Sequence, residues 1–158
     1  SHTPGPETAG QEQITSSRQR RNGMEWTQDL AIGIATIDDQ HKELFKRINN
    51  LVGAIKQHRC KDEIDGTIGF LEDYARFHFS EEEKRMREAG YSGLDEHHKH
   101  HAVYMRNIKD LKEQASLPRV SGASYDLSVT ANQMVVDWIV DHIMKRDKQF
   151  GEFVKKQK

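Results

Sequence analysis

The chain has 158 residues, of which 35% are apolar and 31% charged, a composition typical of one soluble, helix-rich domain with solvated outer faces. Its 24 Lys and Arg residues almost balance its 25 Asp and Glu residues, so no overall field directs the chain towards nucleic acid. The sequence also lacks the run of about 18 apolar residues that a membrane span needs. We therefore expect neither a nucleic-acid partner nor membrane contact by this domain.

Histidine is over-represented and cysteine is rare. The chain has nine histidines, and this excess favours metal binding. The single cysteine, Cys60, excludes an intramolecular disulfide and is interpreted as a free thiol without a role. Because neither a C-x-x-C motif nor a secretory signal is present, we expect a reducing, cytoplasmic compartment.

The first 23 residues are rich in Gly, Ser, Thr, Gln and Pro, which predicts a flexible tail or linker over 1–23. This segment is either a cloning remnant or the joint to a larger protein, and its composition does not decide between them. The domain itself is expected to span residues 24–158. Its first segment, Trp26–Ile37, is apolar and contains Gly and Thr, so we predict an extended N-terminal arm packed across the fold.

Four amphipathic stretches follow, each with apolar residues at alternating steps of three and four. They predict helices at about 39–58, 61–88, 94–116 and 124–155. Short connections between long amphipathic helices favour an antiparallel, up-down-up-down bundle. The expected fold is therefore an all-α four-helix bundle with an extended N-terminal arm.

Every predicted helix places histidine or carboxylate side chains on its apolar face. Residues four apart lie about 40° from each other around a helix axis, so such a pair can direct two donors at one point. Unpaired polar groups among apolar neighbours are costly, and metal coordination is one way to satisfy them. The candidate ligands are His41, His78, Glu82, His97, His101, His142 and Asp147.

Each candidate also has a simpler interpretation. His41 alone would more often be a hydrogen-bonded core histidine, and the pair His78 and Glu82 could be a structural ion pair. His97 and His101 lie in the segment HHKHH, which could be a solvated face. We expect that surface role for the two intervening histidines and for two others: His98, His100, His58 and, in the tail, His2.

The spacing of His142 and Asp147 conflicts with a regular α-helix. Residues five apart lie about 140° from each other around the axis, so they cannot both point inward. A π-type bulge would allow the aspartate to reach back. Alternatively, Asp147 is a solvated charge among its basic neighbours Lys145, Arg146 and Lys148.

In an antiparallel bundle all seven candidates fall at the same end, which makes coincidence unlikely. The imidazoles argue against Mg²⁺ or Ca²⁺, and the absence of cysteine ligands disfavours structural zinc. Seven ligands are too many for one tetrahedral ion. Two metals bridged by Glu82 and Asp147 would use all seven and leave one coordination position open, with iron or manganese both tolerated by these ligands.

The sequence resembles the bacterial hemerythrins, which are oxygen-binding, non-haem di-iron proteins with a four-helix bundle. The similarity covers about Met24 to Phe153 and includes the segments WTQDLAIGI, IDDQHKEL, HFSEEE, YSGLDEHHKHH and WIVDHIMKRD. The connection between the third and fourth helices is somewhat long. Ser92 follows Tyr91 where the family commonly has proline.

The resemblance implies a metal-binding role for each of the seven candidate residues. It implies one iron held by His97, His101 and His142 and another held by His41 and His78. Glu82 and Asp147 would bridge the two irons together with an oxo or hydroxo group. The family also has a histidine and an aspartate five residues apart on its last helix, as His142 and Asp147 are in this chain. Dioxygen would bind at the iron with two histidines, in an apolar pocket for which our candidates are Ile37, Phe79, Met105, Trp138, Ile139 and Ile143.

Reversible dioxygen binding is therefore the expected function, as an oxygen carrier or as the oxygen- or redox-sensing domain of a signalling protein such as a chemoreceptor. A fusion to that protein would run through residues 1–23. The alternative is a di-iron enzyme: a peroxidase, an oxidase or a nitric-oxide scavenger. Oxygen-activating enzymes of the ferritin type carry Glu-x-x-His repeats, and this chain has none, which favours binding over turnover.

Overall fold

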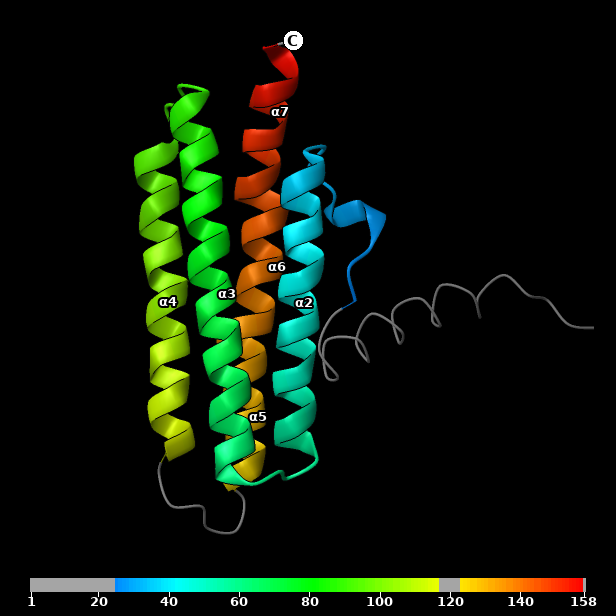
Figure 1. The fold of residues 1–158 in the computed structure, drawn as a ribbon, viewed down its shortest axis with the longest axis vertical. Helices are drawn as coiled ribbons and strands as arrows, with labels where there is room; N and C mark the ends of the chain where they lie inside the picture. The colour runs from blue at the N-terminus through cyan, green and yellow to red at the C-terminus, as the bar shows by residue number, and fades with distance from the viewer. Residues whose placement is uncertain (1–24, 117–122, 158) are drawn as a thin grey trace, which may run out of the picture.

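A computed structural model describes residues 25–116 and 123–157, and nearly all of these residues are helical (Figure 1). A short 3-10 turn, η1 (Gln28–Leu30), precedes three long helices: α2 (Ala35–Lys56), α3 (Lys61–Glu88) and α4 (Leu94–Ser116). A fourth rod follows, made of α5 (Ala123–Ala131), the π-helical turn η2 (Asn132–Asp137), α6 (Trp138–His142), the π-helical turn η3 (Ile143–Asp147) and α7 (Lys148–Lys156).

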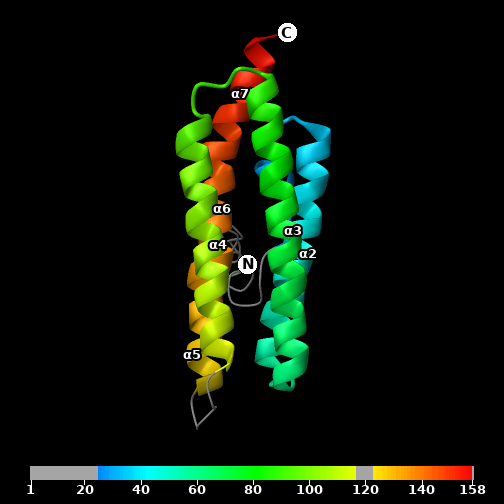
Figure 2. The same cartoon turned by 60° about the vertical axis from the view of Figure 1, so that its left-hand side comes forward.

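The four rods run alternately down and up, as Figures 1 and 2 show from two sides. Helix α3 packs against both α2 and α4, and the fourth rod closes the bundle against α2 and α4. Each chain reversal joins neighbouring, antiparallel helices. The predicted all-α, up-down-up-down four-helix bundle is confirmed.

One apolar cluster fills the bundle along its length. Its members are the inward positions of each helix, which explains why the steps of three and four predicted the helices. In α2, for example, the fully buried apolar side chains are Ile37, Leu44, Ile48 and Leu51. In one half of the bundle this apolar stripe is interrupted by buried polar residues.

The N-terminal arm is shorter than predicted, because α2 begins at Ala35 rather than near residue 39. Ile37, assigned to the arm, lies inside the first turn of α2 and is fully buried. The Asp38 carboxylate accepts the backbone N–H groups of Ile32 at 2.8 Å and Gly33 at 3.4 Å. Asp38 thus ties the arm to the first helical turn instead of acting as the N-cap.

The arm lies close to the fourth rod. A Cβ atom on Gly151 of α7 would fall 2.3 Å from the carbonyl oxygen of Ile32, so only glycine permits this approach. Gly33 has φ +90°, a left-handed conformation that lets the chain turn from the arm into α2. The arm is therefore held against α2 through Asp38 and against α7 through the close approach at Gly151.

Of the two alternatives for the spacing of His142 and Asp147, the structure has the π-type widening, η3, and Asp147 is buried rather than solvated. A π-turn closes its hydrogen bonds between residues five apart, so those residues lie nearly one above the other. The second π-turn, η2, was not predicted. The tail 1–23, with His2, and the connection between α4 and α5 lie outside the described residues. In the described part of the chain, every helix is too polar or too short to cross a membrane.

Candidate metal centre

The helix segments that carry the seven candidate residues lie in the same half of the bundle, the upper half in Figure 1. They come from the start of α2, the end of α3, the start of α4 and the region where α6 passes into η3. The antiparallel topology thus brings the ligand-bearing part of each helix to the same half of the bundle. All seven side chains are buried, with relative exposures between 0% and 3%: His41, His78, Glu82, His97, His101, His142 and Asp147.

Their donor atoms form two clusters that share both carboxylates. The three-histidine cluster consists of His97, His101 and His142 with Glu82 and Asp147. The two-histidine cluster consists of His41 and His78 with the same two carboxylates. Within each cluster, one donor atom from every residue lies within 4.8 Å of the others.

Glu82 presents one carboxylate oxygen to each cluster. Its Oε1 lies 2.7 Å from His97 Nε2 and 3.1 Å from His101 Nε2. Its Oε2 lies 3.3 Å from His78 Nε2 and 3.7 Å from His41 Nε2. A carboxylate in this orientation can bridge two ions.

Asp147 is oriented in the same way from the opposite side of the bundle. Its Oδ1 lies 2.8 Å from His97 Nε2 and 3.1 Å from His142 Nε2. Its Oδ2 lies 3.1 Å from His41 Nε2. The π-turn η3 places Asp147 here, since it brings the carboxylate back beneath His142.

Several of these buried donor atoms have no hydrogen-bond partner among the described residues. They include both ring nitrogens of His41 and His142, Nε2 of His78, Oε2 of Glu82 and Oδ2 of Asp147. Polar atoms buried without a partner cost folding free energy, and a bound cation would satisfy them. The donor set, imidazole nitrogen with carboxylate oxygen, suits a transition metal better than Mg²⁺ or Ca²⁺. The residues therefore fit a pair of metal ions.

Proximity to the carboxylates outweighs burial for two of the histidines. Burial alone lowers the pKa of His41 and of His97, but their interactions with Asp147 and Glu82 raise both pKa values to about 9. For His78, burial dominates and the pKa is lowered. Burial raises the pKa of the Asp147 carboxyl, but the surrounding histidines more than offset it and hold that pKa well below its usual range.

A second layer of residues supports two of the candidate ligands. His78 Nδ1 donates to Gln40 Oε1 at 2.7 Å, and His101 Nδ1 donates to Glu83 Oε2 at 2.7 Å. Sequence reasoning missed both Gln40 and Glu83. Gln40 had a detectable signal, because it lies three residues after Ile37 and four before Leu44, at the spacing of the buried stripe.

The six predicted pocket-lining residues all lie in or against the core. Phe79 stacks on the His101 ring, with centroids 3.9 Å apart, and Trp138 stacks on His142 at 4.8 Å. Ile37, Ile139 and Ile143 are completely buried. Met105 is partly buried against the core. The two aromatic rings cover the outer faces of ligand candidates in the three-histidine cluster.

The other described histidines, His58, His98 and His100, stay outside both clusters, and so does Cys60. His98 is exposed and donates from Nδ1 to Glu83 Oε1 at 2.6 Å, so it contacts the second layer rather than the centre. The His100 ring lies 6.2 Å from the His142 ring. His58 and Cys60 are exposed in the turn between α2 and α3.

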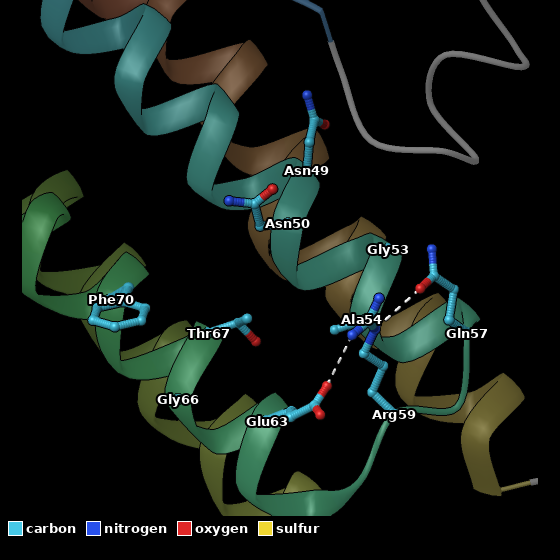
Figure 3. Close-up of a pocket in the computed structure, with 10 residues that line it drawn as sticks. All are labelled: Asn49, Asn50, Gly53, Ala54, Gln57, Arg59, Glu63, Gly66, Thr67 and Phe70. Carbon is cyan, nitrogen blue, oxygen red and sulfur yellow. Dashed lines mark hydrogen bonds and ion pairs between the residues drawn. The ribbon is translucent and has the colours of Figure 1, made fainter.

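A surface hollow in the described part of the chain lies away from this centre. It measures about 630 Å³ and lies between the C-terminal part of α2 and the N-terminal part of α3 (Figure 3). Arg59 donates across its mouth to Gln57 and Glu63. A neighbouring hollow on the same face is lined partly by the same residues, Asn50, Thr67 and Phe70. None of the seven candidates lines either hollow.

Comparison with known proteins gives a consistent result. Residues 32–154 match the family model of the Hemerythrin HHE cation binding domain. A bacteriohemerythrin of Stenotrophomonas maltophilia is 30% identical over 131 residues, which cover 82% of this chain and 80% of the relative. A bacteriohemerythrin of Clostridium acetobutylicum is 28% identical over 131 residues, covering 79% and 96%.

The similarity extends beyond bacteria. The myohemerythrin of Theromyzon tessulatum is 26% identical over 123 residues, covering 78% of this chain and 87% of the relative. The family match spans all seven candidate residues, from His41 to Asp147. The bundle, the buried cluster of histidines and carboxylates, and these relatives agree: the chain belongs to the hemerythrin family.

Proposed function

We propose that this protein binds dioxygen reversibly at a non-haem di-iron centre formed by the two clusters. The observation that carries this proposal is the orientation of Glu82 and Asp147, each of which presents one oxygen to each cluster. Membership of the hemerythrin family supports it. Two ferrous ions held there would supply one electron each to dioxygen and recover both on its release.

The two proposed metal positions differ in the number of histidine donors that face them. Three imidazoles face one position and two face the other, while both carboxylates serve the pair. The two-histidine position therefore has one protein donor fewer, and this is where we place the entry of dioxygen. An oxo or hydroxo group would complete the bridge between the ions.

Reversibility requires that water and external protons stay away from the site. Ile37, Ile139 and Ile143 are completely buried, and Phe79 and Trp138 stack against His101 and His142. We propose that these side chains, with Met105, form the apolar lining that keeps the bound dioxygen dry. Their contribution is to exclude water, since all of them except Trp138, with its indole N–H, lack a hydrogen-bond donor.

The same centre is compatible with two roles, an oxygen carrier or an oxygen- or redox-sensing domain. We propose that residues 24–158 act as one domain in a cytoplasmic protein, and that residues 1–23 either join it to a signalling protein or form a tail. Identification of the chain's natural partners in a pull-down with the full-length protein distinguishes the two. Binding rather than turnover is the proposed role, and multiple turnovers with a reductant and peroxide, faster than free iron, would contradict it.

The proposal is tested by metal content and visible absorption. We expect about two iron ions per chain, and a ligand-to-metal charge-transfer band that appears when air is admitted to the dithionite-reduced protein and disappears on degassing. Iron that oxidises without an oxygen-dependent, reversible band would contradict oxygen binding. Absence of stoichiometric metal would contradict the metal centre itself.

A further inference from the structure

One histidine of each cluster is held from behind by a residue that belongs to neither cluster. In the two-histidine cluster, His78 Nδ1 donates to the amide oxygen of Gln40 at 2.7 Å. In the three-histidine cluster, His101 Nδ1 donates to the carboxylate of Glu83 at 2.7 Å. In both cases Nε2 faces inward, 3.3 Å and 3.1 Å from Glu82.

These contacts determine which nitrogen is the metal donor. A neutral imidazole carries one N–H, so a ring that donates from Nδ1 keeps its lone pair on Nε2. The Nδ1 atoms of His41 and His142 have no such partner among the described residues. Gln40 therefore fixes the tautomer and orientation of the His78 ring, and Glu83 fixes those of the His101 ring.

The two supports differ in charge. Gln40 offers a neutral amide oxygen, whereas Glu83 offers a carboxylate, which draws the Nδ1 proton more strongly and makes Nε2 a better donor. Glu83 is itself held in place, since its second oxygen accepts from His98 Nδ1 at 2.6 Å. The negative support thus lies behind the position that already has three imidazoles.

We propose that Glu83 and Gln40 are positioning residues for His101 and His78, and that the charge of Glu83 strengthens metal binding at the three-histidine position. This inference rests on the proposed function, since it assumes that both clusters hold metal. It predicts stepwise loading, with the three-histidine position filled first. The third imidazole favours the same order, so the contribution of Glu83 must be isolated by substitution.

The test is an anaerobic Co²⁺ titration of the metal-free, full-length protein, followed by visible absorption. Glu83→Gln keeps a hydrogen-bond acceptor and removes the charge, and we expect the tighter binding step to weaken roughly 10- to 100-fold. Gln40→Ala should weaken the other step by a similar factor. The matched control is Glu88→Gln, which removes the same charge from an exposed position on α3 and should change neither step.

A second readout separates positioning from a merely structural role. In the Co²⁺ protein, the Nδ1 protons of ligating histidines give strongly shifted, exchangeable NMR resonances. Glu83→Ala should speed solvent exchange of one such resonance, and Glu83→Gln should restore slow exchange. Thermal unfolding of the metal-free variants shows whether the fold is retained.

The outcomes are distinct. If the unsubstituted protein binds two Co²⁺ ions and Glu83→Gln leaves both steps within about threefold, the inference is wrong while the proposed function stands. Equal weakening of both steps by Glu83→Gln would also overturn it, because the charge would then act without regard to position. If the unsubstituted protein binds no Co²⁺, both the proposed function and the inference fail.

Discussion

Glu82 and Asp147 contribute differently from the five histidines, because each carboxylate spans both clusters while each histidine belongs to one. A histidine substitution should therefore affect one position, whereas loss of a carboxylate should affect both. This division follows from the oxygen positions, with Glu82 Oε1 near His97 and Oε2 near His78. It makes the two kinds of ligand experimentally separable.

We expect His78→Ala to reduce the metal content from about two ions per chain to about one, since the three-histidine cluster keeps all its donors. Glu82→Ala should abolish stoichiometric binding at both positions. Metal analysis after gel filtration measures this. His58→Asn, at an exposed histidine in the turn between α2 and α3, is the control and should retain full content. Full metal content in His78→Ala would rule out the assigned two-histidine position.

The metal-free protein should become less stable as pH rises from 6.5 to above 9. His41 and His97 have pKa values of about 9 when folded, against an ordinary value of 6.5. A pKa raised by folding contributes stability that is complete below the unfolded value and is lost as pH rises through the folded value. The pKa values of Glu82 and Asp147 are lowered in the folded protein, so protonation of these carboxylates changes stability only at acid pH, below this range.

Urea unfolding of chelator-treated protein across this range measures the change. Metal must displace the same two protons, so metal affinity should rise over the interval in which apo stability falls. A metal-free protein whose stability is constant from pH 6.5 to 9.5 would contradict the paired carboxylate–histidine arrangement.

Ile143→Thr should shorten the lifetime of the oxygenated protein. Ile143 is completely buried in η3 directly after His142, so a hydroxyl there would admit water near the centre. Ile55→Thr is the matched control, because Ile55 is 1% exposed near the C-terminal end of α2, far from the centre. The measurement is the decay of the oxygen-dependent band in air. Equal lifetimes in the two variants would mean that Ile143 does not protect the site.

At the scale of elements, two of the four rods, α2 and the fourth rod, show a local adaptation near the centre. Helix α2 begins earlier than its periodicity predicted, because Asp38 accepts amides of the arm. The fourth rod contains two π-turns, and η3 aligns His142 with Asp147. Helices α3 and α4 need no such adaptation, since their ligand pairs are four residues apart.

Gly151→Ala should destabilise the protein by about 1–3 kcal/mol, because the added methyl group would overlap the Ile32 carbonyl. The arm would have to move away from α7. Gly69→Ala is the matched control, since a Cβ there meets nothing within 4 Å in the middle of α3. That control should be neutral or more stable by up to about 1 kcal/mol. Thermal unfolding compares the two, and similar shifts in both would show that the arm contact is unimportant.

At the scale of the whole molecule, the buried polar residues of the described part gather in one half of the bundle. The apolar cluster runs through both halves and includes Ile37, Met86 and Phe150, whereas the seven buried candidate ligands come from helix segments in the upper half of Figure 1. Apolar burial stabilises the lower end by itself. The upper end depends on satisfying its donors, which a pair of metal ions would do.

Removal of metal should therefore loosen one end of the bundle more than the other. We expect hydrogen exchange in the chelator-treated protein to speed up around His41, His78 and His101, while amides near Ile64 and Leu111 keep their protection. Binding to the folded state alone stabilises it, by about 4 kcal/mol at a metal concentration 1,000 times the dissociation constant. Uniform acceleration along all helices would contradict this division.

Much of the fold could be predicted from the sequence, because helix formation and amphipathicity are local. The bounds of α3 and α4 agree with the prediction at both ends. Even the π-turn could be anticipated, since His142 and Asp147 cannot both face inward from a regular helix. The start of α2 could not, because it depends on a contact between Asp38 and the backbone of the arm.

The candidate site divides in the same way. The sequence by itself determined which residues face the core and that four helices bring them to one end, because spacing of three and four residues sets the face of a helix. Only the tertiary structure decided which oxygen of Glu82 meets which histidine, and that Gln40 supports His78 from 38 residues away. Such contacts join distant segments whose relative height and rotation depend on packing of the whole bundle, and local periodicity carries no record of that packing.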